Sequence, residues 1–66
     1  MFVIKLINDY GEYIKGPGST AWKNFSKAYA GKSGVEIRRY NGYITGASTM
    51  VFNTYEDWIA FSMVWG

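Results

Sequence analysis

The first fifteen residues show the hydrophobic pattern of a β-hairpin. Residues 2–7 are rich in β-branched and large apolar side chains, which favour a strand. Both faces of this segment are apolar, which is typical of a central strand. Residues 8–11 (Asn-Asp-Tyr-Gly) have turn chemistry, because Asn, Asp and Gly tolerate the backbone angles of a turn. We therefore expect a hairpin over residues 2–15, which ends at a Gly-Pro-Gly loop.

The apolar spacing then changes to that of a helix. Trp22, Phe25 and Tyr29 recur at intervals of three and four, which is the stripe of an amphipathic helix. A Ser-Thr pair just before this stripe is expected to cap the helix. The pattern predicts a helix over residues 20–30.

Alternating residues return over 35–40, where the pattern predicts another strand. The Asn-Gly dipeptide that follows is a strong signal for a two-residue hairpin turn. We therefore expect a second hairpin over residues 35–52. Residues 46–48 (Gly-Ala-Ser) hold either a bulge or a loop that resets the register.

The last segment is almost continuously apolar. Thr54 and Asp57 have the spacing of a capping box, which places acidic groups at the positive end of a helix dipole. This predicts a helix over residues 54–65. The alternative is a terminal strand at 60–65, because large apolar residues also alternate there.

Together these elements predict an α+β fold in the order ββαββα, with residues 1–66 as a single domain. The expected architecture is a small two-layer sandwich, in which an antiparallel β-sheet of two hairpins carries two helices on one face. The side chains that the pattern assigns to the core are Phe2, Ile4, Leu6, Trp22, Phe25, Tyr29, Ile37, Ile44, Phe52, Trp58 and Phe61.

Composition excludes most enzyme chemistry. The chain of 66 residues has neither Cys nor His, so it lacks Ser-His and Cys-His nucleophile pairs and the usual zinc ligands. The five acidic residues are scattered, and we expect no catalytic residue, no metal and no cofactor. Aromatic residues form 20 % of the chain. Either a small domain uses these large side chains to build its core, or part of them contacts a partner.

Basic residues are concentrated in the middle of the chain. Residues 15–39 contain six Lys or Arg and one Glu. This asymmetry indicates either an anion-facing surface or the solvated side of one helix. Residues 16–20 (Gly-Pro-Gly-Ser-Thr) precede the predicted helix, so they are either an anion site at a helix start or a plain loop with a cap.

The predicted second hairpin would place basic and aromatic side chains on one face, with Tyr40 opposite Tyr43 and Arg38 opposite Thr45. Such a face can stack nucleic-acid bases and bind phosphate, or it can simply hold a stabilising Tyr–Tyr pair. The residues that would contact nucleic acid are Lys23, Lys27, Arg38, Arg39, Tyr40 and Tyr43.

The helix expected over residues 54–65 has more apolar surface than one sheet face covers. This predicts a homodimer through the C-terminal segment. Three functions follow: a non-enzymatic module that binds a larger protein, such as a bacterial or phage inhibitor or modulator, a nucleic-acid-binding domain, or a self-assembling structural subunit. No membrane span is expected, and the location is taken as cytoplasmic. The residues expected to contact a protein partner are Arg38, Tyr40, Tyr43, Met63 and Trp65.

Overall fold

Strands from the two ends of the chain meet in one antiparallel sheet. In the computed structural model, which describes residues 1–46 and 48–66, the strand order is β1-β3-β2. The elements are β1 (Phe2–Lys5), α1 (Pro17–Ala28), the short helix α2 (Ser33–Glu36), the 3-10 helix η1 (Ile37–Tyr40), β2 (Gly42–Thr45), β3 (Thr49–Phe52) and α3 (Tyr55–Trp65).

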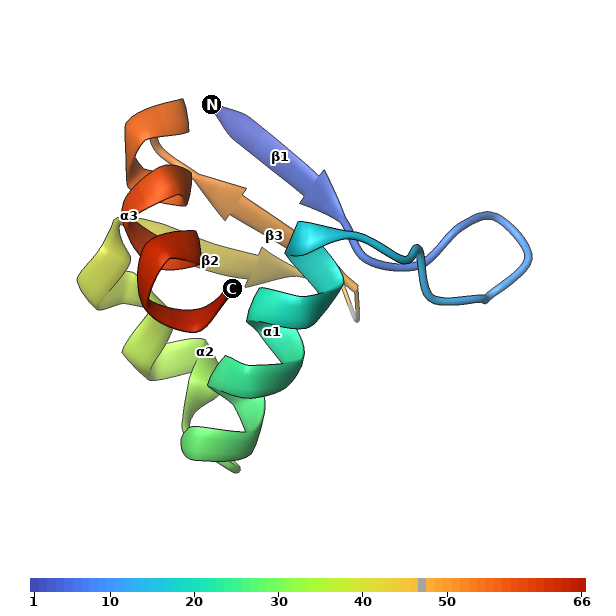
Figure 1. The fold of residues 1–66 in the computed structure, drawn as a ribbon, viewed down its shortest axis with the longest axis horizontal. Coiled ribbons are helices and arrows are strands. Elements are labelled where there is room, and N and C mark those ends of the chain that lie inside the picture. The colour runs from blue at the N-terminus through green and yellow to red at the C-terminus, as the bar shows by residue number, and fades with distance from the viewer. Residues whose placement is uncertain (47) are drawn as a thin grey trace.

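Helices α1 and α3 lie side by side over the same face of this sheet (Figure 1). The predicted α+β class and its two-layer arrangement are therefore confirmed. Each of the eleven side chains assigned to the core is buried or packs against the buried cluster. Ala21 and Met50 are buried as well and were not expected.

Helix α1 begins at Pro17, three residues earlier than predicted. Proline is favoured at the first helical position because its fixed φ suits the helix and its missing N–H needs no partner. The expected cap is wrong for the same reason: Ser19 and Thr20 already lie in the first turn. Their hydroxyl groups donate to the carbonyl oxygens of Ile14 and Gly16 instead.

The strand predicted over 35–40 is wrong, because this segment forms α2 and η1. Ile37 is fully buried and Tyr40 is half-buried, a spacing of three that suits a 3-10 helix. Arg39 also forms an ion pair with Glu36 one turn away, with 2.9 Å between Nε and Oε2. Val35, which the predicted strand placed on its apolar face, is exposed in the helical segment.

The Asn-Gly dipeptide ends a helix instead of forming a hairpin turn. Asn41 follows η1 with a φ of 57°, in the left-handed region that Asn tolerates. Gly42 already belongs to β2 and faces the ring of Phe52 across the sheet. The second hairpin is therefore β2–β3, shorter than the predicted 35–52. Its connection spans residues 46–48, where the expected bulge or loop includes Ala47, outside the described residues.

β1 is an edge strand, not the central strand that its two apolar faces predicted. The central position belongs to β3, in which Met50, Val51 and Phe52 are all buried. The expected return strand of the first hairpin is reduced to a single bridge between Ile7 and Tyr13. The first hairpin is thus a strand followed by a projecting loop.

The predicted capping box at the start of α3 is confirmed. The Thr54 side chain accepts a hydrogen bond from the Asp57 backbone, and the Asp57 carboxylate accepts one from the Thr54 backbone at 3.1 Å. The same carboxylate accepts a hydrogen bond from Asn41 Nδ2 at 3.1 Å, which ties the end of η1 to α3. The rival strand at 60–65 does not form, because α3 continues to Trp65.

We predict that Gly42→Ala destabilises the fold. A Cβ at this position would lie 2.9 Å from two ring carbons of Phe52, closer than packed atoms approach. The overpacking should lower the free energy of unfolding by about 1–3 kcal/mol, measured by urea denaturation. Gly34→Ala is the matched control, since nothing lies within 4 Å of its added Cβ. Equal unfolding midpoints for the two variants would contradict the close approach at Gly42.

We also predict a contribution of Asp57 to the pH dependence of stability. Hydrogen bonds from Asn41 and Thr54 lower the pKa of Asp57 below its ordinary 3.8. A group whose pKa is lower in the folded state stabilises above its unfolded pKa, and this stabilisation is lost as the pH falls through the folded value. Stability should therefore decline below pH 3.8.

The Asp57→Asn variant should be less stable at neutral pH and should lose less stability on acidification. Thermal unfolding measured at pH values above and below 3.8, the ordinary pKa of an aspartate, detects both effects. Glu56→Gln is the control, because it removes a carboxylate from the same first turn of α3 outside the capping box. If the Asp57 variant keeps the full wild-type acid dependence, the assignment to Asp57 is wrong.

Candidate binding pocket beside the arm

The loop after β1 forms a projecting arm, defined here as residues 7–14 (Figure 1). Its tip is closed by Asn8, whose side-chain oxygen accepts hydrogen bonds from the backbone N–H groups of Tyr10 (2.9 Å) and Glu12 (3.0 Å). Gly11 completes the turn with a φ of 78°. The turn chemistry expected of this segment is therefore confirmed, and it holds the aromatic side chains of the arm out of the core.

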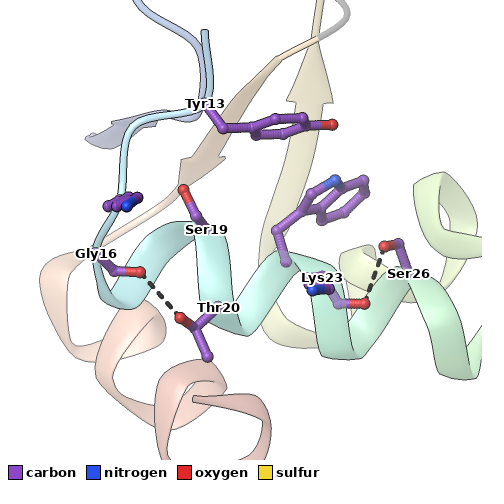
Figure 2. A pocket seen from close by; sticks show the side chains of 8 residues that line it. Tyr13, Gly16, Ser19, Thr20, Lys23 and Ser26 are labelled. Carbon is purple, nitrogen blue, oxygen red and sulfur yellow. Dashed lines mark hydrogen bonds between the residues drawn. The ribbon is translucent and has the colours of Figure 1, made fainter.

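An open pocket of about 650 Å³ lies between the returning limb of the arm and the first three turns of α1. Figure 2 shows the Tyr13 side chain reaching from the arm above the face of α1 that carries Ser19 and Ser26. The arm forms one wall and α1 the other. The residues that line the pocket are Tyr13, Lys15, Gly16, Ser19, Thr20, Trp22, Lys23 and Ser26.

Each wall of the pocket carries one aromatic ring. Tyr13 is 68 % exposed on the arm wall, so its ring is available to a ligand. Trp22, on the α1 wall, is half-buried and anchored to the core, with its ring centroid 6.0 Å from that of Phe25. Aromatic rings bury large areas with little loss of side-chain freedom, so the two walls offer a planar or apolar group two partners.

The charge of the pocket is entirely positive. Lys15 and Lys23 line it, no acidic residue does, and no carboxylate in the described chain lies within salt-bridge distance of either amine. The N-terminus of α1 adds to this charge, because Gly16 provides no side-chain cap and the first turn contains no acid. The pocket therefore suits a ligand that combines a negative charge with a planar or apolar group.

The hydroxyl groups in the pocket direct their protons to the backbone. Ser26 donates to the Lys23 carbonyl oxygen and Thr20 to the Gly16 carbonyl oxygen, each at 3.2 Å. Ser19 donates to the carbonyl oxygen of Ile14 and so ties α1 to the base of the arm. These bonds orient the α1 wall, and the lysine amines remain free to donate to a ligand.

The structure separates the basic and aromatic residues expected on one hairpin face. Tyr40 packs inward at 5.3 Å from Phe61, and its hydroxyl accepts a hydrogen bond from Trp65 Nε1 at 3.2 Å. Tyr43 lies on the opposite face of the sheet, beside a second hollow of about 290 Å³. The expected Tyr40–Tyr43 and Arg38–Thr45 pairs are therefore wrong, since Arg38 and Tyr40 belong to η1 and not to a strand.

The remaining predicted contact residues fall into two groups. Lys23 lines the pocket, whereas Lys27, Arg38 and Arg39 are exposed outside it. Met63 is 81 % exposed on α3, but Trp65 is half-buried with its ring 5.2 Å from that of Phe25. Partner contact at these positions stays a prediction, and the structure gives Trp65 a packing role besides.

Four residues that line the pocket were not assigned to a binding site from the sequence: Tyr13, Lys15, Trp22 and Ser26. Tyr13 and Lys15 were read as part of a strand, and Trp22 as a core residue only. The available signal was the Gly-Pro-Gly reversal between them, because a tight reversal brings the residues before it back against the helix after it.

Within residues 1–46 and 48–66, no three His, Cys, Asp or Glu side chains lie close enough together to hold a metal ion. No helix in the same part of the chain has the length and apolar character that crossing a membrane requires.

Comparison of this chain with protein families, with curated proteins and with solved structures gave no match.

We predict that Tyr40→Phe destabilises the protein, because it removes the acceptor of the Trp65 indole N–H. The loss should be about 0.5–1.5 kcal/mol in the free energy of unfolding, measured by urea denaturation with tryptophan fluorescence. Tyr43→Phe is the control, since the hydroxyl of Tyr43 meets only the Met1 sulfur, at 3.6 Å. Equal losses in both variants would show that the buried Tyr40–Trp65 bond contributes nothing.

Proposed function

We propose that this protein is a non-enzymatic binding module that holds an acidic segment of a larger protein in the pocket between the arm and α1. The observation that carries the proposal is the lining of this pocket: two aromatic rings and two lysines, with no acidic side chain. A module that occupies a segment of its partner in this way would act as an inhibitor or modulator of that partner.

The surroundings of the pocket favour a protein over other anionic ligands. Ile14 and Tyr10 are exposed on the arm beside it, and apolar side chains of this kind gain free energy from contact with another protein surface. Lys27 lies one turn beyond Lys23 on α1 and is exposed, so the positive charge continues along the helix. An extended acidic segment could follow this line from the pocket.

Single-stranded nucleic acid is the second candidate. Tyr13 and Trp22 could stack bases while Lys15 and Lys23 contact phosphate groups, which is how many proteins bind single strands. This candidate uses Lys23 from the predicted nucleic-acid set, but its aromatic residues are different ones. Salt separates the two candidates, because phosphate binding weakens steeply with salt and an interface with apolar anchors weakens less.

Binding of labelled peptides of defined sequence tests the proposal. Fluorescein-labelled peptides with one phenylalanine between glutamates should bind, and the same peptides with glutamines should bind more weakly, measured by fluorescence anisotropy. Tyr13→Ala and Lys23→Glu should each weaken binding of the acidic peptide roughly tenfold, as expected for an anchor residue. An oligodeoxythymidine strand with the same label tests the second candidate.

Two control variants match the test variants in residue type and element. Tyr10→Ala changes a tyrosine of the same arm outside the pocket, and Lys27→Glu reverses a charge on the same helix outside the pocket. Because they lie outside the pocket, both should weaken binding of the acidic peptide far less than Tyr13→Ala and Lys23→Glu do. Binding of the oligonucleotide alone would replace the proposal with the second candidate. Failure to bind either probe at low salt, or equal loss in test and control variants, would overturn the assignment of the pocket.

A further inference from the structure

β1 has the sequence of a central strand and the position of an edge strand. Both of its faces are apolar, yet only one side of it pairs with another strand, β3. Val3, on the face away from the helices, is left 54 % exposed. No described segment of the chain covers the outer side of β1, which lies at the free margin of the sheet in Figure 1. An uncovered apolar edge of this kind is a template for pairing with another strand.

The register identifies the backbone groups on that outer side. The Leu6 N–H donates to the Ser48 carbonyl oxygen at 2.8 Å, which continues the pairing of β1 with β3. Residues of an antiparallel strand direct their N–H and C=O groups alternately to the two sides. Ile4 therefore bonds toward β3, as Leu6 does, and the backbone groups of Val3 and Lys5 point away from the sheet.

We propose that the outer edge of β1 binds a second copy of this chain, with the two β1 strands antiparallel about a twofold axis at Ile4. In this arrangement Val3 lies opposite Lys5 of the partner subunit, and Lys5 lies opposite Val3 of the partner subunit. Each is a hydrogen-bonded pair, so all outward groups of these residues find partners. The two three-stranded sheets become one continuous sheet, in which β1 is central, as its sequence pattern requires.

Charge selects this register and favours a second copy as the occupant. A twofold axis at Lys5 would place two ammonium groups directly opposite each other, which is unfavourable. An axis at Val3 would place Lys5 opposite Met1, which lies outside the strand. With the axis at Ile4, each Lys5 lies across from an exposed apolar side chain that its aliphatic stem can cover. The strand is therefore complementary to itself in the one register that uses both outward residues.

Exposed apolar groups flank the edge on both faces of the sheet. Met1 lies on the open face with Val3, since its sulfur meets the Tyr43 hydroxyl, and it is almost fully exposed. On the helix face, the exposed ring of Tyr55 packs on Phe2 with centroids 5.0 Å apart. A second copy on this edge would remove part of this surface from water, which adds to the backbone hydrogen bonds.

The test is sedimentation equilibrium of the full chain with charge variants at the two paired positions. The wild type should approach twice the 7.5 kDa monomer mass as concentration rises. Val3→Lys places lysine opposite lysine twice and should weaken dimerisation roughly fivefold to tenfold. Adding Lys5→Glu to that variant creates two opposite-charge pairs and should restore the dimer. Lys32→Glu, which reverses an exposed charge outside β1, is the control and should dimerise as the wild type does.

Cross-linking provides a second measurement that does not depend on charge. The chain has no cysteine, so Val3→Cys and Lys5→Cys chains can be mixed and oxidised without interference. The mixture should form far more disulfide-linked dimer than either chain alone, because only the mixed pair lies opposite in this register. Circular dichroism verifies that each variant is folded.

Three results would overturn the proposal. The first is a wild type that stays monomeric at several hundred micromolar. The second is a dimer that Val3→Lys leaves unchanged, which would assign association to another surface such as Met63 and Val64 on α3. The third is a Val3→Lys variant that the added Lys5→Glu does not rescue, which would exclude the register. Peptides of a different protein that pair with β1 in a monomeric wild type would identify another occupant.

Discussion

Edge-on packing around Phe25 is the interaction on which the rest of the structure depends. Its ring is fully buried, and five other aromatic rings lie with their centroids within 6.0 Å of its own. They come from α1 and the residue that follows it, from η1 and from α3, so one side chain joins these three helices. Aromatic rings prefer such tilted and edge-to-face contacts, and they bury the large areas that a chain of 66 residues needs.

This cluster also determines which aromatic residues remain available for binding. Tyr40 and Trp65 are drawn inward and satisfy each other through the indole N–H and the phenol oxygen. Trp22 is held at the margin of the cluster, with one side against Phe25 and the other toward the pocket. Part of the exposed aromatic surface therefore lies on the arm, in Tyr10 and Tyr13, and the predicted grouping of Tyr40 with Arg38 on a sheet face does not form.

The sequence was sufficient for the two long helices. The capping box favoured the helix α3 over the alternative strand at 60–65, and the three- and four-residue spacing of Trp22, Phe25 and Tyr29 identified α1 although its predicted cap was wrong. Residues 35–40 carried conflicting signals, because alternation fitted a strand while Ile37 and Tyr40 fitted a helical turn. Asn-Gly suits both a hairpin and a left-handed helix end. Packing against Phe25 and Phe61 decides the outcome, and that information is not local.

The pocket was beyond local sequence reasoning for a similar reason. Tyr13 and Trp22 belong to different elements, and they meet only because the chain reverses at Gly16. A strand that continued past Tyr13 would have carried Lys15 away from α1. The sequence did show many aromatic residues along the chain and a concentration of basic residues in its middle, but it did not show which of them would share a surface.

The thin attachment of the arm gives the two walls of the pocket very different rigidity. The α1 wall is fixed to the core, whereas the arm is held at its base by the Ile14 N–H bond to the Leu6 carbonyl oxygen and by the Ser19 hydroxyl. Segments tied to the core by so few bonds open locally without global unfolding, so their amide protons exchange with solvent early. A ligand between the walls would slow this exchange in the arm, and, because it binds only the folded chain, it would also raise the free energy of global unfolding. Occupancy of the pocket is thereby coupled both to a local opening equilibrium and to the stability of the whole domain.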